Sequence, residues 1–228
     1  MTTLLFHKPY GVLSQFSPEP GSRWQTLASF VNEPHVYAAG RLDADSEGLL
    51  LLTSDGPLQH RLTDPRFGHW RRYWVQVEGD ANAHPDAIAA LERGVLIQGQ
   101  RTLPARARVL SADALSAAAI AERDPPIRTR RHIPTSWVEL ELREGRNRQV
   151  RRMSAAVGLP TLRLIRVAID LMDGEPPLSL AGLQPGCWRS ASAQESARLR
   201  QLQRLGRPSP VRGGRAGGGK SGQGDGGG

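Results

Sequence analysis

The chain has 228 residues, of which 39% are hydrophobic and 23% charged, so it is long enough for a sizeable core and too apolar to be disordered throughout. Its single cysteine, Cys187, excludes an internal disulfide and a cysteine-based metal site, and no apolar run approaches the roughly 18 residues of a membrane span. The net charge of +8 favours an acidic partner. We expect a cytoplasmic protein with no signal sequence and no membrane contact.

The hydrophobic periodicity predicts short strands interrupted by a few helices. The alternation of Tyr73, Val75 and Val77 with polar residues, for example, is typical of a half-buried strand. In chain order we predict a strand at 2–5, a short helix at 26–31, a helical turn at 57–62, a strand at 73–78, a helix at 85–93, strands at 95–97, 105–110 and 136–142, a helix at 146–157, a strand at 162–171 and a terminal helix within 193–206.

Strands outnumber helices in this prediction, and the helices are not regularly interleaved with them. This order indicates an α+β protein with a largely antiparallel mixed sheet flanked by helices. We expect one domain over residues 1–192 with no domain before it. Residues 207–228 contain ten Gly and few apolar side chains, which predicts a disordered Gly/Arg-rich tail.

The segment GRLDADSEGLLLLTSDG, residues 40–56, places one carboxylate, Asp43, between Arg41 and a run of four leucines at 49–52. A nearby cation favours an ionised carboxylate, whereas an apolar wall removes water from it. We therefore expect Asp43 to be buried there. Such an acid is either a structural ion pair or a nucleophile or base, and spacing alone leaves both open.

Positive charge is concentrated in residues 127–166, which contain ten Arg, no Lys and three Glu. GC-rich codon usage explains the preference for Arg over Lys but not this clustering. Within EGRNRQVRRM, residues 144–153, a helix would place Arg148, Arg151 and Arg152 on one face. One of them could pair with Asp43 while the others meet phosphates, and a merely solvated cationic face is the alternative.

Other site chemistries find little support in the sequence. DADSEG resembles the start of a calcium loop, but Ser54 occupies the twelfth position, where such a loop needs a bidentate Glu. The six His never occur at metal-ligand spacing, and no phosphate-binding loop or nucleophile elbow is present. We expect no metal and no cofactor.

Four motifs in order, GRLDADSEGLLLLTSDG, RRYWVQVEG, EGRNRQVRRM and LRLIRVAI, resemble those of the RsuA/RluB/E/F family of pseudouridine synthases. The opening LLFHKPYGVLSQF is also similar to that family, and the resemblance spans roughly residues 4–189. The stretches LPARA, DPPIRTRRHIPTSW and GLPTLRLIR look most like the branch of ribosomal large subunit synthase E. Most relatives begin with an S4-type RNA-binding domain, which this chain lacks. The resemblance implies the pseudouridine synthase fold with a central RNA-binding cleft.

The resemblance also implies residue roles. Asp43 matches the catalytic aspartate, Tyr73 the tyrosine that stacks on the target base, and Arg151 the arginine paired with the catalytic carboxylate. Substrate-binding positions are then Arg41, Tyr73, Arg151, Leu164 and Arg166, and RNA-binding positions are Arg146, Arg148 and Arg152. His7 stands where relatives usually have Asn, which leaves the hydrogen bonding of the first turn open. From the residues alone, Tyr73 could equally be a core residue.

The implied activity is isomerisation of one uridine to pseudouridine in domain V of 23S ribosomal RNA, by a monomer. Three alternatives stay open: a relative of the same family acting on another ribosomal uridine, a noncatalytic RNA-binding factor, and a glycoside or nucleoside hydrolase. The hydrolase would need a second carboxylate, for which Asp45 is the candidate. Side chains at positions i and i+2 seldom converge, which argues against it.

Overall fold

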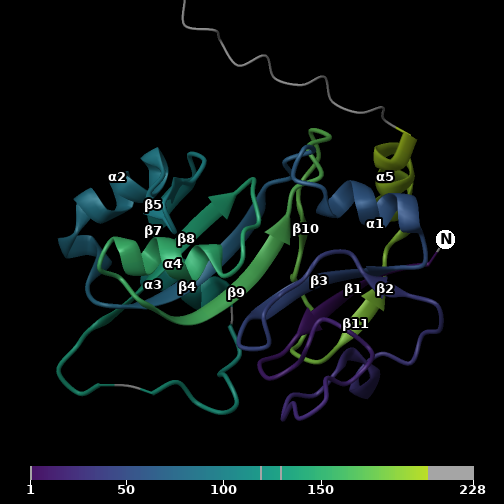
Figure 1. Cartoon of the computed structure of the whole chain (residues 1–228), viewed down its shortest axis with the longest axis horizontal. Helices are drawn as coiled ribbons and strands as arrows, with labels where there is room; N and C mark the ends of the chain where they lie inside the picture. The colour runs from purple at the N-terminus through teal and green to yellow at the C-terminus, as the bar shows by residue number, and fades with distance from the viewer. Residues whose placement is uncertain (1, 119, 129, 205–228) are drawn as a thin grey trace, which may run out of the picture.

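A mixed sheet of nine strands runs through the residues that the computed structural model describes, which are 2–118, 120–128 and 130–204 (Figure 1). The strands are β1 (Thr3–Lys8), β2 (Tyr37–Ala38), β3 (Glu47–Thr53), β4 (Arg71–Glu78), β7 (Arg106–Val109), β8 (Thr135–Leu142), β9 (Thr161–Ile169), β10 (Leu178–Ser179) and β11 (Trp188–Ser190), with β5 (Leu96–Ile97) and β6 (Gln100–Arg101) forming a separate hairpin. The helices are η1 (Leu27–Ser29), α1 (Gly56–Thr63), η2 (Ala81–Ala83), α2 (Pro85–Arg93), α3 (Ala112–Ala118), α4 (Gln149–Ala156) and α5 (Ala193–Arg204).

The order of the strands confirms the predicted α+β class. The sheet runs β11-β1-β3-β9-β4-β8-β7, with β2 beside β3 and β10 beside β9. Every pair in it is antiparallel except β3 with β9. In Figure 1, α2 and α4 lie with β4 and β8 in one half, and α1 and α5 lie with β1 and β3 in the other.

The parallel pair β3–β9 joins the two halves, and it depends on a glycine. Gly48 pairs with Arg166, and its φ of +114° is one that L side chains rarely adopt. A Cβ on Gly48 would lie 2.3 Å from the Arg166 carbonyl oxygen. The glycine of the GRLDADSEG motif therefore permits the close approach of two backbones next to the Asp43 loop.

The leucine run forms the centre of β3 and not a wall beside Asp43, which corrects the expectation. Leu49 and Leu51 pack into the core under α1 and α5, whereas Leu50 and Leu52 pack into a second core against η1. All four are fully buried. A strand covered on both faces has no polar alternation, which explains why the pattern did not predict a strand here.

Most other predicted elements are confirmed with shifted ends. Helix α2 has the predicted bounds, with Pro85 at its first position and Gly94 at positive φ after its end. Helix α4 begins three residues later than predicted, and residues 112–118 of an Ala-rich stretch, for which we predict no definite element, form α3. The terminal helix is α5, whereas the predicted tail at 207–228 lies outside the described residues.

Candidate active site

The loop that holds Asp43 connects β2 to β3 and is fastened to the first turn of the chain. The Asp43 carbonyl accepts a hydrogen bond from the Ser46 amide at 3.0 Å, which closes a turn. The Ala44 carbonyl accepts from the Gly11 amide at 2.7 Å. The Ser14 hydroxyl donates to the Leu42 carbonyl at 2.8 Å and accepts from the Leu42 amide at 2.9 Å. These bonds fix the loop on both sides of Asp43.

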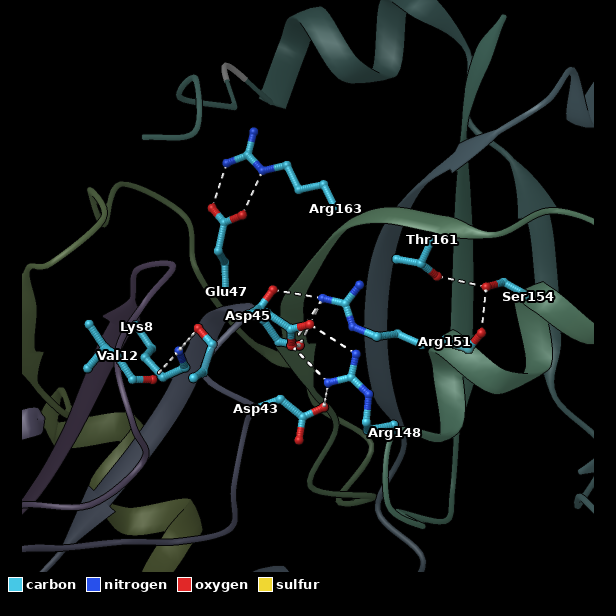
Figure 2. Close-up of polar contacts among 12 residues, drawn as sticks. Lys8, Val12, Asp43, Asp45, Glu47, Arg148, Arg151, Ser154, Thr161 and Arg163 are labelled. Carbon is cyan, nitrogen blue, oxygen red and sulfur yellow. Dashed lines mark hydrogen bonds and ion pairs between the residues drawn. The ribbon is translucent and has the colours of Figure 1, made fainter. Parts of the chain in front are cut away.

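Lys8, at the end of β1, adds hydrogen bonds that hold the first turn and the Asp43 loop together. Its side chain is fully buried, and Nζ donates to the carbonyls of Val12 at 2.6 Å, Pro9 at 3.0 Å and Ala44 at 3.4 Å (Figure 2). Burial lowers the pKa of Lys8 to about 7, against the opposing fields of the nearby acids. Lys8 and Ser14 thus support the Asp43 loop, a role that we did not predict from the sequence.

Arg148 is the cation that faces Asp43. Its Nη1 lies 3.4 Å from Asp43 Oδ2, and the same guanidinium donates to both oxygens of Asp45 at 3.2 and 3.0 Å (Figure 2). Arg148 precedes α4 in the left-handed conformation, with φ 51° and ψ 33°. This unusual backbone aims its side chain at the loop and delays the start of the helix.

Arg151, predicted to pair with Asp43, instead contacts its neighbours. Its Nη2 donates to the Asp45 carbonyl at 2.7 Å and lies 3.4 Å from both the Asp45 carboxylate and the Ser46 hydroxyl. Burial alone would raise the pKa of Asp45, but the hydrogen bond from Arg148 and the field of Arg151 hold it below its ordinary value. Asp43 and Asp45 therefore converge on one guanidinium, contrary to our expectation for positions two apart.

A cleft of about 570 Å³ opens in front of Asp43. Tyr73 from β4 and Leu164 from β9, which are 8% and 6% exposed, contribute to its lining. The other apolar lining residues are Leu13, Leu42, Ala44, Leu142 and Val150, and besides Asp43 the acids Glu19 and Glu144 line the cleft. The cationic lining residues are Arg41, Arg146 and Arg148. Residues predicted from three separate motifs thus meet at one cleft.

Asp43 itself is more accessible than predicted. Its side chain is 37% exposed, because no leucine of the run reaches it and Arg41 turns to the surface. Arg41 makes no hydrogen bond or ion pair with any described residue. Leu42 and Leu142 line the cleft beside Asp43. Leu142 ends the strand predicted at 136–142, but the sequence alone does not show what this side chain faces.

The other predicted arginines lie around the cleft in different environments. Arg166 is buried and donates from Nε to the Leu49 carbonyl at 2.7 Å, so it joins β9 to β3 and is not part of the cleft lining. Arg152 binds Asn147 and Gln98 on the surface of α4. Arg146 pairs with Glu144 at 3.2 Å and donates to the Arg101 carbonyl at 3.0 Å.

Within residues 2–118, 120–128 and 130–204, no group of three His, Cys, Asp or Glu side chains is placed to hold a metal ion. None of the helices in this part of the chain combines the length and the apolar character needed to cross a bilayer.

The cleft thus combines an aromatic ring, that of Tyr73, with the Asp43 carboxylate. Residues 2–156 match the family model for RNA pseudouridylate synthases. A ribosomal large subunit pseudouridine synthase E of Xanthomonas campestris pv. campestris is 55% identical over 84% of this chain and 96% of its own length. The synthase of that name from Vibrio parahaemolyticus is 46% identical over 82% of this chain and 72% of its own.

Among solved structures, a pseudouridylate synthase is similar with a TM-score of 0.64 and 28% identity, covering 87% of this chain and 73% of the other. The shared fold, the match over residues 2–156 and the identity to these relatives agree with one another. The chain belongs to the RNA pseudouridine synthase family.

Proposed function

We propose that the chain isomerises one uridine to pseudouridine in domain V of 23S ribosomal RNA, with Asp43 as the reacting carboxylate. The observation that supports this most is the position of Asp43, whose partly exposed side chain lines a cleft that also contains Tyr73 and Leu164. The relatives named ribosomal large subunit pseudouridine synthase E support the choice of RNA. Action as a monomer in the cytoplasm is part of this proposal.

The reaction exchanges one bond of the ribose for another. The C1′–N1 bond breaks, the freed uracil rotates, and a C1′–C5 bond forms. The proton on C5 leaves and N1 ends with a proton, so atoms balance without a co-reactant. Asp43 begins the exchange, either by attacking C1′ or by removing a proton from C2′, and both routes need an ionised carboxylate beside the sugar.

The surroundings of Asp43 suit a detached base. Tyr73 offers a ring on which uracil stacks, and Leu42, Leu142 and Leu164 restrict access of water that would hydrolyse the intermediate. Extruding the uridine from its stack costs about a few kcal/mol. Phosphate contacts from Arg146, Arg148 and Arg152 offset this cost. Arg41 contacts the backbone of the RNA, and Arg151 holds the Asp43 loop in place.

A two-carboxylate hydrolase is disfavoured by the position of Asp45. Both Asp45 oxygens are engaged by Arg148, Arg151 adds a third contact, and Asp45 does not line the cleft. Asp45 is therefore not placed to act as the second carboxylate of a hydrolase, and Glu144, another acid at the cleft, is held by Arg146 and Gln149. A noncatalytic RNA-binding factor would use the arginines but would gain nothing from Asp43 facing the cleft beside Tyr73.

The substrate is tested by mapping carbodiimide-dependent reverse-transcription stops in ribosomal RNA from a strain that lacks the gene. We expect one stop in domain V of 23S RNA to disappear, to return with the wild-type gene and to stay absent with Asp43→Asn. Loss of a stop elsewhere in ribosomal RNA would reassign the target uridine. An unchanged set of stops would refute the proposed function.

A further inference from the structure

A second hollow, of about 960 Å³, adjoins the cleft and has no role in the reaction described above. Its lining comes from residues 14–17, the segment 31–41 and two side chains of α1. Ser14 and Arg41 line both this groove and the cleft. The groove therefore continues the cleft past Arg41, and an RNA strand with one nucleotide at Asp43 is in position to reach it.

Tyr37 is the most prominent side chain of this groove. It is 61% exposed, although its backbone is fixed by pairing with Thr53 of β3. His35 beside it is also exposed, and Phe16 contributes a further ring. A large aromatic side chain held on a rigid strand without burial is the arrangement used to stack an unpaired base.

Arg41 supplies the charge at the border between the groove and the cleft. Its guanidinium is exposed and makes no hydrogen bond or ion pair within the described part of the chain, so its donors are available to a ligand. It stands two residues before Asp43 on the same fastened loop. Glu33 is the one acid that lines the groove, so a base suits the groove itself and a phosphate suits its Arg41 end.

We propose that this groove binds a second unpaired nucleotide of the RNA strand whose uridine enters the cleft. Its base stacks on Tyr37 and its phosphate pairs with Arg41. The inference rests on the proposed function, because that function places an RNA strand at Asp43. It assigns Arg41 to the recognition of RNA and not to the charge state of Asp43.

Tyr37 is tested by binding and turnover of unmodified, in vitro transcribed 23S ribosomal RNA. Tyr37→Ala is expected to weaken RNA affinity by about five-fold or more, as stacking on an aromatic ring implies, and to raise KM by more than it lowers kcat. Tyr37→Phe keeps the ring and should restore affinity to within about two-fold of wild type on the same grounds. Met172→Ala removes another exposed apolar side chain outside both the groove and the cleft and is the matched control.

Arg41 is tested by the salt dependence of the same binding. Arg41→Ala should reduce the slope of log affinity against log salt by about 0.7, the value for one phosphate contact on single-stranded nucleic acid, whereas Arg41→Lys should keep it. Arg200→Ala, which replaces an exposed arginine on α5 that lines neither the groove nor the cleft, should leave the slope unchanged.

Two results would overturn the inference: equal affinity for Tyr37→Ala and Met172→Ala, or a loss with Tyr37→Phe as large as with Tyr37→Ala. An unchanged salt slope in Arg41→Ala would also contradict it. Absence of pseudouridine after incubation with wild type would instead refute the proposed function, and the binding comparison would still decide whether the groove holds RNA.

Discussion

Two acid–arginine pairs lie near the junction of β3 and β9, and they differ in their hydrogen bonding and in their burial (Figure 2). Glu47 accepts two hydrogen bonds from Arg163, at 2.8 and 2.7 Å, and these side chains are 3% and 6% exposed. Asp43 has a single contact with Arg148 at 3.4 Å, and these side chains are 37% and 42% exposed. We call Glu47–Arg163, which is buried with both carboxylate oxygens engaged, the sealed pair, and the partly exposed Asp43–Arg148 the open pair.

The difference indicates separate roles for two acids only four residues apart. The sealed pair joins β3 to β9 across the parallel junction, and Arg163 also donates to the Ala121 carbonyl at 3.0 Å. Both Glu47 oxygens are occupied, so Glu47 has no capacity for chemistry. Asp43 has one weakly engaged oxygen and a cleft in front of it. Burial and two short hydrogen bonds are typical of a structural acid, whereas the incomplete pairing of Asp43 fits the reactive role that we propose for it.

The largest effect on stability is expected when the sealed pair is broken. Glu47→Gln removes the charge that compensates buried Arg163, and we expect the free energy of unfolding to fall by about 3 kcal/mol or more. Urea denaturation measures this. A double replacement of Glu47 and Arg163 by Leu should recover much of the loss, because no buried charge remains. A cost below about 1 kcal/mol for Glu47→Gln would show that the pair is not sealed.

His69, just before β4, is a further buried titratable group, but within the described residues it has no salt bridge like the one between Glu47 and Arg163. Burial, with a smaller contribution from Arg71, lowers its pKa from 6.5 to about 4. Between pH 6.5 and 4 the unfolded chain binds a proton there and the folded chain does not, so stability falls as the pH is lowered through this window. The fall attributable to His69 is at most about 3 kcal/mol.

The measurement for His69 is the free energy of unfolding at pH 7 and pH 4 for wild type and His69→Gln. The variant should show a smaller decrease on acidification, since the other titrating groups are shared. The same decrease in both proteins would mean that His69 titrates normally in the fold.

A smaller loss of stability is expected from replacing Arg151, which holds the Asp43 loop through its contacts with Asp45. Arg151→Ala removes the hydrogen bond to the Asp45 carbonyl, and we expect a loss of about 2 kcal/mol in stability together with slower isomerisation. Arg151→Lys can replace one of these contacts and should recover part of both. If Arg151→Ala matched wild type in denaturation and in single-turnover rate, the loop would not depend on this contact.

Local patterns predicted elements well where hydrophobic and polar residue types alternate or where Pro and Gly mark the ends of a helix. Alternation identified β4 and β8, and the Pro85 and Gly94 signals gave the bounds of α2. The same reasoning failed for β3, because both of its faces are buried and its leucine run lacks a period of two. The late start of α4 follows from Arg148, whose left-handed backbone reflects a tertiary contact that local sequence does not encode.

Residue types and motifs predicted which residues meet at the cleft better than they predicted which arginine contacts Asp43. Asp43, Tyr73 and Leu164 meet at one cleft although they are far apart in sequence. The partner of Asp43 could not be inferred, because Arg148 and Arg151 are three residues apart and the helix predicted at 146–157 would place both on one face. Lys8 and Ser14 were missed because their importance lies in hydrogen bonds to backbone carbonyls, which any Lys or Ser could in principle make.

The central claim is that Asp43, and neither of the acids close to it, reacts with the ribose. Single-turnover tritium release from uridine-labelled 23S RNA tests this most directly with Asp43→Asn and its matched control Asp45→Asn, each with RNA affinity measured in parallel. We expect Asp43→Asn to bind RNA nearly as well as wild type and to release no tritium, while Asp45→Asn retains turnover. Full turnover by Asp43→Asn would contradict the account.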